Sequence, residues 1–178
     1  MDKVMIPADY WLGDGLLEAE IPWLTPEAIM CMHHYLKPTH RVLEFGSGGS
    51  TVFMARRVKN VVAFESLPGW EQKTRHYCLN HDLYNVEIHE CHDVKQAVPF
   101  VGDSRFDVAL VDCVEIDRRD AVAYALSVVD HPGLLVIDNY SAPYCTGIDA
   151  LLSHIPPERI TNYDDPHWVG NGTKVVYL

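Results

Sequence analysis

Short apolar runs rich in Val, Ile and Leu alternate along this chain with longer segments of helical periodicity. This alternation is typical of βα units around a parallel sheet. The runs do not alternate strictly between apolar and polar residues, as expected of parallel strands with helices on both faces. Five runs are predicted to be parallel strands: 41–45, 61–65, 86–89, 108–111 and 134–137.

The flanking segments complete a predicted α/β fold. Thr25-Pro26-Glu27 has the residues of a helix start, and the helix is expected to run to about Leu36. Further helices are expected over 51–58, over 70–80, and from an N-cap at Asp117 to a stop at Pro132-Gly133. The last predicted strands, 159–163 and 174–177, form a terminal hairpin.

Length and composition limit the alternatives. At 178 residues we expect a single domain, 1–178, in which residues 1–24 fit no regular element and form an N-terminal arm or lid. The chain has 25 acidic and 14 basic residues, a net charge of -11, which disfavours nucleic acid and anionic membranes as partners. Five cysteines without a C-x-x-C pair, and an N-terminus without a long apolar run, predict a cytoplasmic protein.

A glycine-rich turn directly follows the first predicted strand, in the sequence Glu44-Phe-Gly-Ser-Gly-Gly-Ser-Thr51. Ligands of open α/β sheets bind at this place, beside the N-terminus of the next helix. A dinucleotide fingerprint starting at Gly46 needs a third glycine at position 51, where this chain has threonine. A nicotinamide cofactor is therefore disfavoured.

Two acids at strand ends indicate a different cofactor. Glu44 precedes the turn and suits a cationic ligand better than a pyrophosphate, and S-adenosylmethionine carries a sulfonium and an ammonium but no phosphate. Glu65 ends the second predicted strand, 21 residues after Glu44, where an acid accepts hydrogen bonds from both ribose hydroxyls. Together the turn and the two acids predict an adenosyl site.

These residues resemble the class I S-adenosylmethionine-dependent methyltransferases, in particular a small group with an E-x-G-S-G-G-S-T turn. The resemblance covers about residues 23–178 and implies a Rossmann-like, mostly parallel seven-stranded sheet whose antiparallel last strand comes from the terminal hairpin. It also implies roles for single residues. Glu44, Gly46, Ser47 and Gly48 would line the methionine end, Glu65 would bind the ribose, Ser66 would lie near the adenine, Asp93 would receive the adenine amino group, and Asp112 would lie near the transferable methyl group.

A metal site is a further hypothesis. Asp112 ends the fourth predicted strand and Asp138-Asn139 ends the fifth, so three oxygen ligands that suit Mg²⁺ would meet at one sheet edge. The pattern is similar to metal-dependent catechol and sugar O-methyltransferases, except that Glu115 occupies the place of a lysine in the catechol enzymes. Asp138 and Asn139 are alternatively expected only to cap the strand and turn the chain.

Other chemically suggestive residues have simpler explanations. Strand alternation separates the side chains of His89-Glu-Cys-His-Asp93, which disfavours zinc. Trp70 is expected in the core rather than in the wall of the adenine pocket, and Arg118 is expected to pair locally with neighbouring aspartates. His167 is a candidate general base.

The sequence thus predicts a methyltransferase that acts on a small-molecule acceptor, with a hydroxyl group as one candidate, and with Asp112 and His167 as its candidate catalytic residues. Two alternatives remain open. One is an adenosylmethionine-binding module without turnover, acting as a sensor or partner subunit. The other is an NAD-dependent oxidoreductase, which the missing glycine and the expected last strand disfavour.

Overall fold

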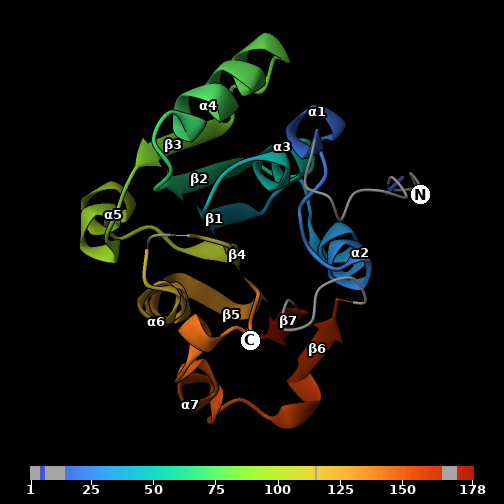
Figure 1. The fold of residues 1–178 in the computed structure, drawn as a ribbon, viewed down its shortest axis with the longest axis vertical. Helices are drawn as coiled ribbons and strands as arrows, with labels where there is room; N and C mark the ends of the chain where they lie inside the picture. Colours follow the sequence, from blue (N-terminus) through green and yellow to red (C-terminus); the bar gives the residue numbers. More distant parts are fainter. Residues whose placement is uncertain (1–4, 7–14, 115, 166–171) are drawn as a thin grey trace.

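A computed structural model describes residues 5–6, 15–114, 116–165 and 172–178. Its strands form one seven-stranded sheet in the order β3-β2-β1-β4-β5-β7-β6 (Figure 1). The strands are β1 (Arg41–Phe45), β2 (Asn60–Glu65), β3 (Val86–Glu90), β4 (Phe106–Val111), β5 (Val129–Asp138), β6 (Ile160–Asp164) and β7 (Gly172–Tyr177). β1 to β5 pair in parallel, whereas β7 is antiparallel to both β5 and β6. The predicted sheet and its terminal hairpin are confirmed.

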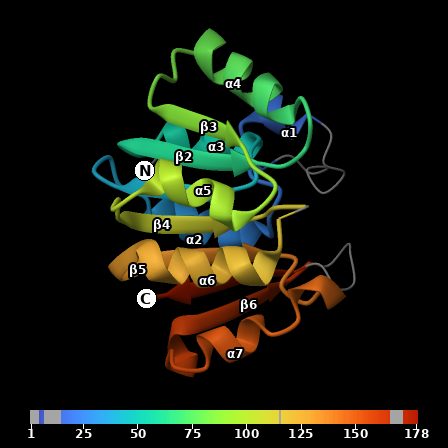
Figure 2. The same cartoon turned by 90° about the vertical axis from the view of Figure 1, so that its left-hand side faces the viewer.

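Helices cover both faces of this sheet. They are α1 (Leu16–Ala19), α2 (Pro26–Tyr35), α3 (Gly49–Ala55), α4 (Trp70–Asn80), α5 (Val94–Val101), α6 (Arg118–Val128) and α7 (Ile148–Leu152), with short 3₁₀ turns η2 (Pro143–Cys145) and η3 (Pro157–Arg159). One buried apolar cluster joins the sheet to α1, α2, α3 and α4, and another joins it to α5, α6 and α7. Figure 2 shows α5 and α6 in front of the strands. No helix within the described ranges is long and apolar enough to cross a membrane.

Strand alternation determines which face carries the strand-end acids. In β1, Val42 packs in the cluster under α1 to α4, whereas Leu43 and Phe45 pack under α5 to α7. Glu44 has the same parity as Val42 and therefore belongs to the α1 to α4 face. The same parity holds in β2, β4 and β5 for the acids Glu65, Asp112 and Asp138.

Two predicted helices have boundaries that differ from the prediction. The helix expected over 51–58 is α3, which begins at Gly49, so two residues of the glycine-rich turn already belong to it. The expected stop at Pro132-Gly133 lies inside β5 instead. α6 ends at Val128 because Val129 already pairs with Phe106, and the register shift before the pair of Val108 with Leu134 accommodates the extra residues.

The described part of the N-terminal arm contains one short helix. Residues 15–24 contain α1, whose Leu16 and Leu17 are buried together with Ile21 and Leu24. This segment lies directly against α3. A Cβ atom on Gly49 would lie 2.2 Å from the carbonyl oxygen of Ile21 and 2.5 Å from that of Leu16, so the close contact requires a glycine.

Candidate functional site

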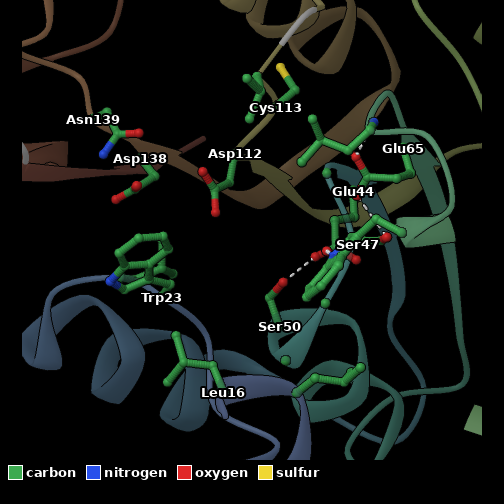
Figure 3. Close-up of a pocket in the computed structure, with 18 of the residues that line it drawn as sticks. Leu16, Trp23, Glu44, Ser47, Ser50, Glu65, Asp112, Cys113, Asp138 and Asn139 are labelled. Carbon is green, nitrogen blue, oxygen red and sulfur yellow. Dashed lines mark hydrogen bonds between the residues drawn. The ribbon is translucent and has the colours of Figure 1, made fainter. Parts of the chain in front are cut away.

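A cavity of about 750 Å³ lies at the carboxyl ends of the strands. Most of the predicted site residues line it: Glu44, Gly46, Ser47, Gly48, Glu65, Asp112, Asp138 and Asn139. β1 lies between β2 and β4, so the strand order reverses here, as it does at the ligand sites of open α/β sheets. Figure 3 shows Glu44, Ser47 and Glu65 on one side of the cavity, Asp138, Asn139 and Trp23 on the other, and Asp112 between them.

The glycine-rich turn lies between the carboxyl ends of β2 and β4, the two strands that flank β1. Gly46 donates its N–H to the carbonyl of Phe64 at 2.8 Å, and it adopts a φ of 109°. A Cβ atom on Gly46 would lie 2.4 Å from the carbonyl oxygen of Asp112. Both the dihedral angle and the contact therefore require glycine. The indole N–H of Trp70 donates to the carbonyl of Ser47 at 2.6 Å and fixes the other side of the turn.

Glu44 is held by the helix that follows the turn. The Ser50 hydroxyl donates to its Oε1 at 2.5 Å and the Thr51 hydroxyl donates to its Oε2 at 2.7 Å. Only 1% of Glu44 is exposed, and this burial raises the pKa of its carboxyl group to about 8, although the two hydroxyls oppose the shift. Glu44 lines the cavity, but both its oxygens are engaged by α3, which explains the Ser-Thr pair that ends the motif.

Glu65 is the carboxylate at the predicted ribose position. Its Oε1 accepts the backbone N–H groups of Ser66 at 2.8 Å and Leu67 at 2.9 Å, and its Oε2 accepts the Ser47 hydroxyl at 2.8 Å. These bonds fix the carboxylate at the cavity wall. Leu67 lines the cavity, whereas the buried Ser66 is not among the lining residues.

A further predicted residue, Asp93, does not line the described cavity. Asp93 is exposed and forms the N-cap of α5, where its Oδ1 accepts the N–H of Lys95 at 2.8 Å. Its contact with the adenine stays a prediction. His167 lies outside the described residues, and its role as a base stays a prediction as well.

Asp112 and Asp138 form the opposite end of the cavity. The Thr173 hydroxyl donates to Asp138 Oδ1 at 2.9 Å and itself accepts the N–H of Thr25 at 3.1 Å, so Asp138 is tied to the start of α2. Burial and the charge of Asp112 raise the pKa of Asp138 well above its usual value. Burial also raises the pKa of Asp112 to about 6, although Arg118 opposes this shift.

Arg118 is a site residue whose role the sequence reasoning missed. Its Nη2 donates to Asp112 Oδ1 at 3.3 Å and to Asn139 Oδ1 at 3.0 Å, so the expected local pairing is wrong. The exposed Arg119 is the residue that pairs locally, with Asp120 at 3.8 Å. A sequence signal existed, because Arg118 precedes the inward-facing residues of α6 at helical spacing: Ala121, Val122 and Ala125.

Arg118 lies against two of the three candidate metal ligands and would repel a divalent ion bound there. Mg²⁺ bound to both Asp112 Oδ1 and Asn139 Oδ1 at about 2.1 Å would lie no farther than about 5 Å from Nη2 of Arg118. At that distance the repulsion between the two cations is about 7 kcal/mol for an effective dielectric constant of about 20. Within the described ranges, no group of three or more His, Cys, Asp or Glu side chains is arranged to hold a metal ion.

The remaining cavity wall comes from α4, from the N-terminal segment that the sequence predicted to be an arm or lid, and from the loop after β4. Trp70 lines the cavity and does not simply fill the core, and Lys73 lies over its ring, 4.3 Å from the centroid. Apolar walls come from α1, from the segment before α2 and from the loop after β4: Leu16, Leu17, Ile21, Trp23, Leu24, Cys113, Val114 and Ile116.

Comparisons with solved structures agree with this fold. No family model and no curated protein matches the sequence. Among solved structures, the chain is similar to an O-methyltransferase from Bacillus cereus in complex with S-adenosylhomocysteine, with a TM-score of 0.68, 18% identity, and 98% of this chain and 94% of the other covered. The chain is also similar to an O-methyltransferase from Streptomyces achromogenes involved in tomaymycin synthesis, in complex with S-adenosylmethionine. The TM-score is 0.66 at 16% identity, with 98% of this chain and 91% of the other covered.

An rRNA methylase from Streptococcus thermophilus gives a TM-score of 0.67 at 16% identity, with 97% of this chain and 98% of the other covered. The chain has the class I methyltransferase fold. In this methyltransferase fold, the glycine-rich turn, Glu65 and Asp112 occupy the edge of the sheet at which the sequence resemblance placed the cofactor. The structural likeness extends over nearly the whole chain, beyond the 23–178 that the motifs suggested.

Proposed function

We propose that this protein is an S-adenosylmethionine-dependent methyltransferase that acts on a small-molecule acceptor. The observation that carries the proposal is one cavity that joins the glycine-rich turn and Glu65 to a second, acidic end at Asp112 and Asp138. A volume of about 750 Å³ is at the upper end of small-molecule sites and leaves room for an acceptor beside the cofactor.

The residues of the turn fit the cofactor. When bound, S-adenosylmethionine would supply a methyl group whose bond to the cationic sulfur breaks as an acceptor nucleophile attacks the methyl carbon in line, so that S-adenosylhomocysteine remains. Glu65 presents a carboxylate that backbone N–H groups already orient, and it would receive the ribose hydroxyls in exchange for the Ser47 hydroxyl. Gly46 and Gly48 keep side chains away from the methionine end, and Ser66 and Asp93 are proposed for the adenine end.

The acidic end suits an acceptor that loses a proton. A hydroxyl group must give up its proton as it accepts a methyl group. A carboxylate is most effective as the general base when its pKa lies near the working pH. Asp112, with a pKa raised to about 6, lies beside the acceptor space and can take this proton near neutral pH. Alignment of the acceptor by the surrounding walls supplies the rest of the catalysis. We therefore favour O-methylation.

A small acceptor is favoured over nucleic acid by charge. The cavity wall includes Asp117 and Asp165 in addition to the site acids, and the whole chain carries a net charge of -11. Both features repel a phosphate backbone.

All five cysteines are free, which supports the cytoplasmic location that the sequence suggested.

Calorimetric titration tests the cofactor proposal. S-Adenosylhomocysteine is expected to bind, NAD is expected to bind more weakly, and Glu65→Ala is expected to weaken the binding of S-adenosylhomocysteine by about 1–3 kcal/mol. Glu90→Ala is the matched control, because Glu90 ends β3 directly beside Glu65 and does not line the cavity. Tighter binding of NAD would overturn the proposal.

Turnover needs a separate assay with labelled S-adenosylmethionine and a panel of phenols, alcohols and amines. Methyl transfer to a member of the panel is the expected result. Tight binding of S-adenosylhomocysteine without any transfer would support the binding module, either a sensor or a partner subunit, over the enzyme.

A further inference from the structure

One buried arginine connects the ends of two neighbouring strands at the acceptor side of the cavity. The side chain of Arg118 is 5% exposed. Its Nη2 contacts the side-chain oxygens of Asp112 and Asn139, and its Nη1 donates to the backbone carbonyls of Asp138 at 2.8 Å and Val111 at 3.4 Å. The guanidinium is thus surrounded by oxygen atoms from β4 and from the end of β5.

This environment retains a permanent positive charge. An arginine stays protonated in proteins, and a buried guanidinium is tolerated only when carboxylate and carbonyl oxygens replace its lost hydration. Among the described contacts, one carboxylate and three neutral oxygens do so. Asn139 has a φ of 50°, a left-handed conformation that asparagine tolerates, and its amide oxygen accepts from the guanidinium.

We propose that the Arg118 guanidinium is the resident cation of the acceptor end, and that this end works without a divalent metal ion. The same oxygens of Asp112 and Asn139 that would bind a metal ion already bind the guanidinium. Arg118 is a positioning residue: it fixes these two side chains at the cavity wall and balances the charge of Asp112.

The proposal has a consequence for the acceptor, which rests on the proposed methyltransferase function. A metal ion selects acceptors with two adjacent oxygens that chelate it. With Arg118 in place, an acceptor has to approach Asp112 and Asp138 by direct hydrogen bonds, for which a single hydroxyl group is sufficient. Substrates without a vicinal diol are therefore expected.

Manganese binding tests the proposal without relying on activity. Titration of the wild-type protein with Mn²⁺, followed by electron paramagnetic resonance, is expected to show no site at the acceptor end up to about 1 mM. The affinity for S-adenosylhomocysteine is expected to agree within about twofold in Mg²⁺ and in EDTA. A Mn²⁺ site with a dissociation constant below about 0.1 mM that is lost in Asp138→Asn would overturn the proposal.

Variants at the arginine provide the complementary test. Arg118→Met removes the charge and keeps much of the stem, and it is expected to tighten Mn²⁺ binding at least about tenfold. Arg118→Lys should not bind the ion, and Arg119→Met is the control, since Arg119 is exposed and pairs with Asp120. Circular dichroism shows whether Arg118→Met is folded. If the folded variant binds no Mn²⁺, the oxygens of Asp112 and Asn139 do not form a metal site, and the proposal that the guanidinium takes the place of a metal ion is refuted.

Unfolding of Arg118→Met would leave the decision to the titration of the wild type and its comparison with Asp138→Asn. The test is also separate from that of the proposed function. A wild-type protein that fails to bind S-adenosylhomocysteine contradicts the methyltransferase proposal, whereas Mn²⁺ binding alone decides the role of Arg118.

Discussion

The buried carboxyl group of Glu44 should make the stability of this protein depend on pH in an unusual direction. Its pKa is raised from 4.5 to about 8 in the folded state, mainly by burial. The folded protein therefore holds this proton more tightly than the unfolded chain does. The free energy of unfolding must fall as the pH rises from about 4.5 to about 8, and the stabilising contribution is fully present only below that range.

The size of this effect follows from the shift. One pKa unit corresponds to about 1.4 kcal/mol, so between pH 5 and 8 ionisation of Glu44 should lower the free energy of unfolding by about 3–4 kcal/mol. Glu44→Gln mimics the protonated carboxyl, because an amide also presents one acceptor oxygen and one hydrogen-bearing atom to Ser50 and Thr51. The variant should lack this part of the pH dependence.

Urea unfolding of the ligand-free protein at several pH values measures the difference. The quantity to compare is the free energy of unfolding of the wild type minus that of Glu44→Gln, because other titrating groups cancel in it. This difference should fall by about 3–4 kcal/mol from pH 5 to pH 8. Glu158→Gln, at an exposed position, is the control. A difference that is constant over this range would refute the reasoning about Glu44.

Three further changes test the parts of the site separately. Gly46→Ala introduces a clash with the Asp112 carbonyl and should lower the free energy of unfolding in urea by at least about 3 kcal/mol. Gly102 is the control: it has a φ of 53° and open space around it, so Gly102→Ala should cost about 1 kcal/mol. Equal losses in the two variants would show that the clash at Gly46 is not important. Trp70→Phe removes the donor to the turn and should weaken calorimetric binding of S-adenosylhomocysteine severalfold; unchanged affinity would show that the turn holds its shape without the indole. Asp93→Ala should lower the stability of the protein by about 0.5–2 kcal/mol through loss of the cap on α5, and stability equal to that of the wild type would argue against the cap. Asp93→Asn can still cap the helix, so a loss of cofactor affinity in that variant would confirm the predicted adenine contact.

The sheet could be predicted because its strands are local features of the sequence. The run at 41–45 has three large apolar residues and ends at the glycines of the turn, and the structure has the same strand. The end of α6 could not be predicted from local residues. Pairing between Phe106 and Val129, which are distant in sequence, ends the helix before Pro132 is reached.

The meeting of the strand-end acids at one cavity was predictable for a related reason. Parallel strands bring their carboxyl ends to one edge, so acids such as Glu65 and Asp112 could be assigned to one site before the structure was known. The hydrogen-bond partners of these acids could not be assigned from the sequence. Whether Arg118 turns outward to its neighbours or inward to Asn139 depends on carbonyl oxygens supplied by two separate strands.

The shared parity of the four strand-end acids makes the site sensitive to the length of each strand. Inserting one residue into β1 ahead of Glu44 would turn its carboxyl toward the apolar layer around Phe45, whereas inserting two would restore its side of the sheet. The same holds independently for Glu65, Asp112 and Asp138. The side of the sheet on which each acid lies therefore depends on whether the number of residues before it in its strand is odd or even. Insertions or deletions of two residues are expected to keep the acids on the cavity side, whereas single insertions or deletions are not.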